Sequence, residues 1–227
     1  MNKQIHLLLT TAFAVVFAAA ATSMSASPAR TRTRTGTFSD SKGNSGTTSS
    51  STTRSPGSRQ HSSTLTNQDG QTASHTSAAT WDKNTDSGTF SSSTTGLNGK
   101  TSSRQGTVSE TADNTYQIQG SSTGPKGKSS AFDLTKTKTD TGSNTVGVIT
   151  GPNGKVSTLN STTTKSADGY TKDTTVTGPK GKTEERTVDT KINPDGSGTR
   201  TIESTGPDGK SYSRTETFSA PTSAPDN

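Results

Sequence analysis

The sequence contains no cysteine and one tryptophan, and aromatic residues make up only 4% of it. Without cysteine, neither a disulfide bond nor a lipid attached to cysteine is available. With only three histidines as well, the chain lacks a ligand set for a structural zinc site. Hydrophobic residues amount to 21% of the 227 residues, which is too few to bury a large core. No metal and no cofactor are therefore expected.

Motifs that carry catalysis are equally scarce. The stretch Asp140-Thr141-Gly142 resembles the aspartic protease motif, but that chemistry needs two such carboxylates in apolar surroundings and a second copy is absent. The stretch Asp86-Ser87-Gly88 resembles a serine nucleophile loop, which needs a rigidly placed histidine as its base. After the N-terminal 26 residues the chain has only two histidines, His61 and His75, and both lie in a polar stretch. We expect a protein that is not an enzyme and has no catalytic residues.

What the sequence does contain is a repeated turn. Residues 205–210 read Thr-Gly-Pro-Asp-Gly-Lys, and close copies occur at 177–182, 150–155, 123–128 and 95–100. The second glycine of the motif recurs every 27 to 29 residues, at Gly43, Gly70, Gly99, Gly127, Gly154, Gly181 and Gly209. Self-similarity at a fixed period indicates a tandem array, here of about seven units.

The chemistry of this turn predicts a β-hairpin. Pro207 presets the backbone of a type I turn, and Gly209 can adopt the left-handed conformation of a following G1 bulge. The predicted register then pairs Thr205 with Ser211 and continues to Arg200 opposite Glu216. The same rule at the turn from Gly124 to Lys128 places four apolar residues on one face: Tyr116, Ile118, Phe132 and Leu134.

Other turn signals lie midway between the glycines. Each repeat unit is therefore predicted to contain two strands of about eight to ten residues. The expected fold is all-β: an antiparallel up-and-down meander of about seven hairpin repeats, forming an extended or single-layer sheet. Two alternatives stay open, because the apolar stripe is sparse. The sheet can fold or pair to cover that stripe, or the chain can stay largely disordered until it assembles.

Composition divides the chain into four parts. Residues 1–26 are typical of a secretory signal peptide, with a basic start, an apolar stretch and small residues after it. Residues 27–84 are rich in Ser, Thr and Gly, carry weak repeats and are expected to be poorly ordered. Residues 85–218 form the hairpin repeat region, and 219–227 are expected to be a disordered tail. The predicted location is the periplasm, the cell surface or the extracellular space, with no transmembrane segment in the mature chain.

The net charge of +6 has a regular component at the predicted hairpin tips. Lysines recur there, at Lys100, Lys126, Lys128, Lys155, Lys180, Lys182 and Lys210. One interpretation is a candidate rim that binds anionic polymers such as lipopolysaccharide, polysaccharide or extracellular DNA. The other is that lysine keeps the turns solvated and prevents edge-to-edge aggregation.

The Gly-Pro-x-Gly-Lys turns and the predicted signal peptide resemble those of a loose group of exported bacterial repeat proteins without an assigned function. The plan is also similar to that of curli-type fibre subunits, although their regular Gln and Asn ladders are absent. The main hypothesis is a non-enzymatic β-repeat protein of the cell envelope or extracellular matrix that acts by self-association or surface adhesion. Open strand edges invite such association. The alternative is a binding module for anionic envelope polymers.

Overall fold

The computed structural model describes residues 29–223, so the predicted signal peptide at 1–26 lies outside the described residues. The described chain is built from strands alone and contains no helix that is long and apolar enough to cross a membrane. The strands are β1 (Arg30–Asp40), β2 (Ser45–Ser55), β3 (Ser58–Asn67), β4 (Thr72–Thr80), β5 (Ser87–Thr95), β6 (Thr101–Ala112), β7 (Thr115–Thr123), β8 (Ser129–Thr139), β9 (Gly142–Thr150), β10 (Val156–Ser166), β11 (Gly169–Thr177), β12 (Thr183–Ile192), β13 (Gly198–Thr205), β14 (Ser211–Phe218) and the short β15 (Thr222–Ser223).

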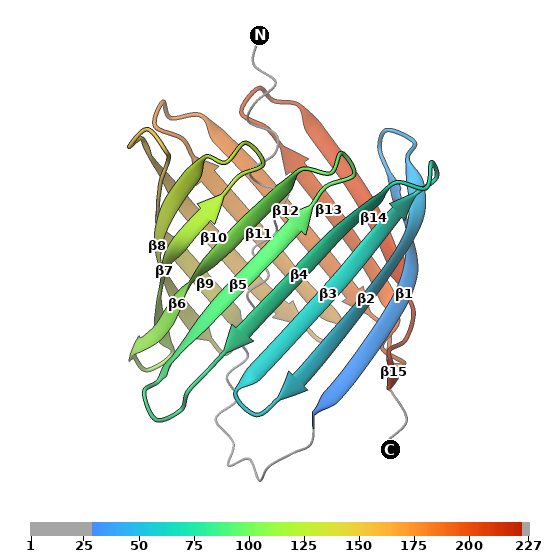
Figure 1. Ribbon diagram of the computed structural model, residues 1–227, viewed down its shortest axis with the longest axis horizontal. Coiled ribbons are helices and arrows are strands. Elements are labelled where there is room, and N and C mark those ends of the chain that lie inside the picture. Colours follow the sequence, from blue (N-terminus) through green and yellow to red (C-terminus); the bar gives the residue numbers. More distant parts are fainter. Residues whose placement is uncertain (1–28, 224–227) are drawn as a thin grey trace.

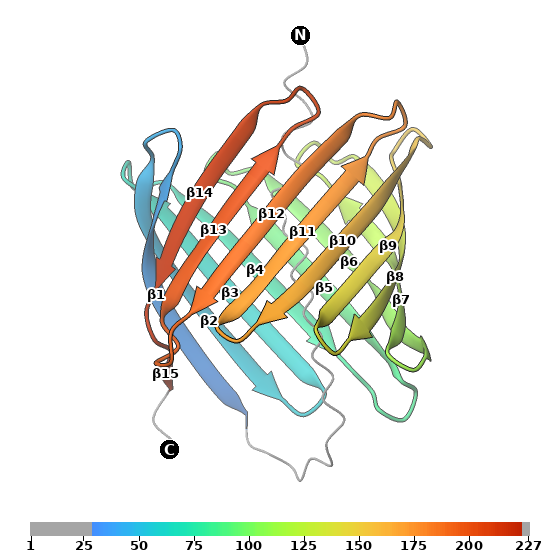
Figure 2. The ribbon, with the colours of Figure 1, turned by 180° about the vertical axis from the view of Figure 1, so that it is seen from behind.

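The fourteen long strands form an antiparallel meander in which each strand pairs with its neighbours in sequence. β14 also pairs with β1, so the sheet closes into a barrel of tilted strands (Figures 1 and 2). The meander is confirmed, whereas the expected extended, open sheet is wrong: the single sheet closes on itself, as in the alternative in which it folds to cover its apolar stripe. Strand twist accumulates across a long sheet and brings its two ends together. Closure then satisfies the backbone groups that an open edge leaves unpaired.

The polar N-terminal region takes part in the barrel. Residues 27–84 are predicted to be poorly ordered, but the structure forms β1 to β4 there. Each of these strands has a hydrogen-bonded partner on both sides, which compensates for the small number of apolar side chains. In the predicted disordered tail, β15 pairs with Arg32 and Thr33 of β1, and residues 224–227 lie outside the described part.

The predicted hairpin geometry is confirmed at the 205–210 turn. The Gly206 amide donates to the Lys210 carbonyl at 2.8 Å, and the Gly209 amide donates to the Gly206 carbonyl at 2.9 Å. Gly209 has a φ of +76°, the left-handed conformation that the bulge needs. The register runs from Thr205 opposite Ser211 to Arg200 opposite Glu216, as the sequence predicts.

The two faces of the sheet differ in composition, because side chains alternate along each strand. The outward face carries mainly Thr and Ser, and some of them bond across strands, such as Thr95 to Thr101 at 3.0 Å. The inward face holds the core. Its buried cluster consists of Phe90, Val108, Tyr116, Ile118, Phe132, Leu134 and Leu159, which come from β5 to β8 and β10. The predicted common face of Tyr116, Ile118, Phe132 and Leu134 is therefore confirmed.

Candidate functional site

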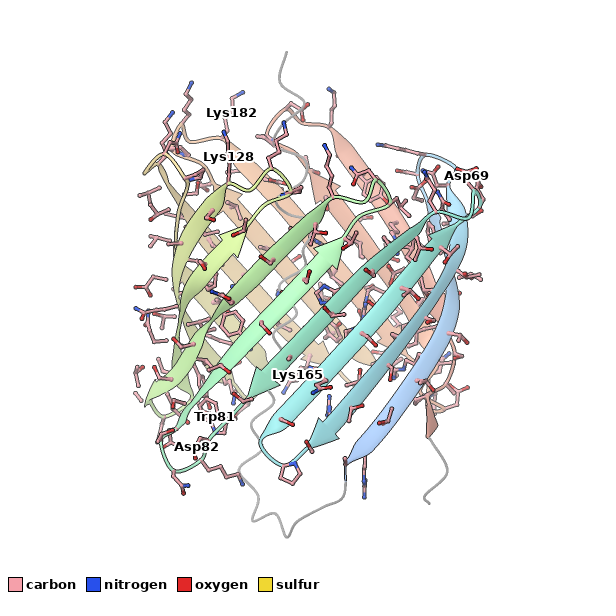
Figure 3. The ribbon with its side chains drawn as sticks, viewed as in Figure 1. Asp69, Trp81, Asp82, Lys128, Lys165 and Lys182 are labelled. Carbon is pink, nitrogen blue, oxygen red and sulfur yellow. The ribbon has the colours of Figure 1, made fainter. Side chains whose placement is uncertain are left out.

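The hairpin-tip lysines all lie at one end of the barrel. They come from the turns β5–β6, β7–β8, β9–β10, β11–β12 and β13–β14, and in a meander every second turn is at the same end. Figure 3 shows Lys128 and Lys182 at this end, with Trp81 and Asp82 at the other. We call the following exposed residues the lysine rim: Lys100, Lys126, Lys128, Lys155, Lys180, Lys182 and Lys210.

The rim is an exposed surface and not a built pocket. Lys210 forms an ion pair with Asp208 in its own turn at 3.1 Å, yet the lysine side chain stays 79% exposed. An exposed pair of this kind contributes little stability and leaves the ammonium group accessible. What the rim offers is a row of mobile positive charges that follows the circumference of one barrel end.

A second concentration of positive charge lies inside. The cross-strand pairs and the alternation of burial place most strand cations on the inward face, including Arg34, Arg59, Arg104, Lys136, Lys138, Lys165, Lys172, Arg186, Arg200 and Arg214. The outward charges on the strands are acidic apart from Lys191: Asp133, Asp173, Glu185, Asp189 and Glu203. The inward face also carries four acids, so only the cations are concentrated on one face of the sheet; these acids are Asp40, Glu110, Glu184 and Glu216.

Within this inward face, four lysines gather on β8, β10 and β11, and we call Lys136, Lys138, Lys165 and Lys172 the basic wall. Pairing in register places Lys138 opposite Ser143, Ser143 opposite Thr163, and Thr163 opposite Lys172. The next row links Lys136 through Thr145, Ser161 and Thr174 to Arg186. Each row has cations at its ends and hydroxyl groups between them.

Burial and mutual repulsion shape the ionisation of the basic wall. Burial lowers the pKa of Lys172 to about 8, and the positive charges of Lys136, Arg186 and Arg104 contribute to that lowering. Burial also lowers the pKa of Lys136, with Lys138 and Lys165 as the neighbouring cations. Lys138 donates to the Tyr116 hydroxyl at 2.9 Å, with its ammonium group 4.4 Å from the centre of the Tyr116 ring.

Three further inward cations contact core rings or a carboxylate: Arg104, Arg200 and Arg214. Arg104 lies 4.1 Å from the centre of the Phe132 ring and 5.4 Å from that of Phe90, and burial lowers its pKa to about 10. Glu216 contacts Arg214 at 2.6 Å and Arg200 at 3.8 Å. These contacts tie the cations to core rings and to a carboxylate, so they have a structural role.

Residues that the sequence singled out for other chemistry are scattered. His61 and His75 face inward from β3 and β4, where they bond to the hydroxyls of Thr52 and Thr94. Asp140 and Asp86 lie in separate turns, at β8–β9 and β4–β5. Among residues 29–223, no three His, Asp or Glu side chains come together as a metal site.

Sequence reasoning missed the basic wall. The rim lysines recur at the repeat period in five turns, which made them visible, whereas the inward lysines keep that spacing only from Lys136 and Lys138 to Lys165. The signal that was present is alternation: Lys136 and Lys138 share the parity of Phe132 and Leu134, and therefore their face.

Comparison with known proteins provides no family assignment. No protein-family model matches the chain, and a search of curated proteins found no significant match. The resemblance to exported bacterial repeat proteins thus stays a prediction from the turn motif and the predicted signal peptide.

Proposed function

We propose that this protein is an exported, non-enzymatic binding module of the cell envelope or extracellular matrix, and that its lysine rim binds anionic polymers. The observation that carries the proposal is the gathering of all seven rim lysines at one end of the barrel. A row of cations along a circular edge attracts a long polyanion at several points at once.

Surface adhesion is a consequence of this binding, since lipopolysaccharide and polysaccharides coat the cell surface. Self-association through strand edges finds less support. That hypothesis starts from open edges, and in the closed barrel the edge strands β1 and β14 pair with each other. Attachment of the protein to a surface is therefore better explained by the lysine rim than by strand-edge pairing.

The test compares the purified protein with a variant in which Lys126, Lys128, Lys180 and Lys182 are changed to Gln. The probes are lipopolysaccharide and a DNA duplex, titrated at several salt concentrations. The unmodified protein binds both more weakly as salt rises, because binding releases counterions. For DNA, the slope of log K against log salt becomes shallower by about 0.9 for every phosphate that the variant no longer neutralises.

A matched control removes the same charge from the opposite end of the barrel, by changing Arg30, Arg54, Lys83 and Lys191 to Gln. If net charge alone drives binding, the two variants lose affinity equally and the rim has no special role. Undiminished binding by the rim variant also refutes the proposal. Both variants should keep the circular dichroism spectrum of the unmodified protein, since all eight residues are exposed or in turns.

A further inference from the structure

The basic wall has donors of two kinds in a fixed order. In the row from Lys138 to Lys172, two ammonium groups flank the hydroxyls of Ser143 and Thr163. Neighbouring strands lie about 4.8 Å apart, so the ends of this row are about 14 Å apart at the backbone. That span exceeds the size of one phosphate or sulfate group, while the long lysine side chains can converge on a larger anion.

Negative charge on the inward face begins only beyond the wall, at Glu110 on β6 and Glu184 on β12. From β7 to β11, every inward-facing charged residue is a lysine of the basic wall, and the remaining inward side chains are apolar, Tyr, Ser or Thr. Ammonium groups donate three hydrogen bonds each, and hydroxyl groups donate one. Such a surface suits an oxyanion with many acceptor oxygens and disfavours a cation.

The hydroxyl groups are held in place by the sheet. Ser161 is 6% exposed and shares a hydrogen bond of 2.8 Å with Thr174 on the neighbouring strand. Because backbone pairing sets the rows, the strand positions that carry the donors are fixed before a ligand arrives, which lowers part of the entropic cost of binding.

The mutual repulsion of the lysines favours a negatively charged ligand. Lys136, Arg186 and Arg104 surround Lys172 with positive charge, and Lys138 and Lys165 do the same for Lys136. An anion among them relieves this repulsion and favours the charged form of both lysines.

Exposure to solvent differs along the wall. Lys165 is exposed, and Figure 3 shows it in the part of the barrel away from Lys128 and Lys182. Lys136, Lys138 and Lys172 are half-buried. Solvent exposure therefore decreases from Lys165, near the barrel end, to the other three lysines of the wall.

From this arrangement we propose that the basic wall is a second binding site, for a small molecule that carries two or more phosphate or sulfate groups. The site differs from the lysine rim in its residues, its face of the sheet and the size of its ligand. It does not depend on polymer binding at the rim.

The test is calorimetric titration at neutral pH in about 0.1 M salt, where exposed charges are screened beyond about 10 Å. The probes are inorganic tripolyphosphate and a sulfated heparin disaccharide, so that the phosphate and sulfate forms of the ligand are distinguished. We expect one molecule to bind per chain. Removal of one charge-assisted hydrogen bond should weaken binding about tenfold or more.

Two variants locate the site. Lys136→Gln with Lys172→Gln removes two wall charges and should abolish most of the affinity. The matched control, Lys126→Gln with Lys128→Gln, removes two rim charges and should leave it within about twofold. A further variant, Thr163→Val, keeps the charges and removes one hydroxyl, and it should weaken binding about fivefold.

The fold of the wall variant is checked by its melting temperature, which should be maintained or raised because two repelling, half-buried charges are gone. The proposal is overturned if neither probe binds, if the wall variant binds as tightly as the unmodified protein, or if the rim control shows the same drop in affinity. If the rim variant still binds polymers as the unmodified protein does, the proposal for the lysine rim fails and the proposal for the basic wall stands.

Discussion

Phe132 lies directly opposite Gly120, and its ring covers the position that a side chain at residue 120 would occupy. A Cβ atom added there would meet the Phe132 ring at 2.6 Å and the Cα of Gly106 at 2.8 Å, besides contacting the Gln105 carbonyl. The same pairing of an inward phenylalanine with an opposite glycine occurs at Phe38 with Gly46 and at Phe90 with Gly106. Glycine is thus needed where a ring folds over the neighbouring strand.

Gly120→Ala should therefore destabilise the barrel. The backbone atoms around residue 120 cannot give way easily, and overpacking of this kind costs about 1–3 kcal/mol or more. For a protein of this size, each kcal/mol lowers the melting temperature by about 2–4 °C. Thermal unfolding followed by circular dichroism measures the change. The control is Ser121→Ala, one residue along on the outward face, which should leave the melting temperature nearly unchanged; equal decreases in both variants contradict the packing argument.

The hairpins could be predicted from the sequence because their chemistry is local. The Gly-Pro-x-Gly-Lys turn fixes both the reversal and the register over the next six residues on each side, as the pairing of Arg200 with Glu216 shows. Alternation then assigns each side chain to a face. Neither step needs information from outside one repeat.

Closure could not be predicted in this way. It depends on the summed twist of fourteen strands and on pairing between residues far apart in sequence, such as Thr37 and Thr217. The basic wall depends on the same information. Lysines on β8, β10 and β11 look scattered along the chain and become one surface only when the register of four consecutive strands is known.

The barrel can be locked at its seam with a disulfide. Thr37 on β1 is opposite Thr217 on β14, and their hydroxyl groups are 2.9 Å apart on the outward face. Directly opposed residues of antiparallel strands have the Cα spacing that a disulfide needs. Because the chain has no cysteine, the double variant Thr37→Cys, Thr217→Cys has one possible internal pair.

This double variant should form an intramolecular disulfide under mild oxidation and migrate as a monomer whose mobility changes on reduction. The control places cysteines at Thr47 and Thr217, which lie on strands that are not neighbours. An open sheet predicts free thiols or disulfide-linked dimers for both variants, and that result contradicts closure.

Stability should rise with pH in the alkaline range because of Lys172. Its pKa is about 8 in the folded protein and 10.5 ordinarily, so between these values the unfolded chain binds more protons. The contribution of uncharged Lys172 to the stability of the folded protein is present in full above pH 10.5 and is lost as the pH falls through about 8. Melting temperatures from pH 7 to pH 10 should rise more steeply for the unmodified protein than for Lys172→Met. Both proteins keep the charged neighbours of residue 172, which are Lys136, Arg186 and Arg104. If the melting temperature changes with pH equally in both proteins, that result contradicts the burial of Lys172.

The two histidines should make the barrel sensitive to acid. Burial is the main cause that lowers the pKa of His61 below 6.5, and Arg59 and His75 add positive charge nearby. Burial also lowers the pKa of His75, whose ring centre is 6.1 Å from that of His61. In the unfolded chain both rings take up a proton at about pH 6.5, whereas in the folded chain their pKa values are lower. The stability that depends on the neutral rings is therefore present above pH 6.5 and is lost as the pH falls through the pKa values of the folded protein.

The variant His61→Gln, His75→Gln keeps a polar side chain at each position and should unfold at a melting temperature that changes less between pH 7 and pH 5. Chemical-shift titration of the ring protons provides the direct check, and midpoints at or above 6.5 contradict the burial of these rings.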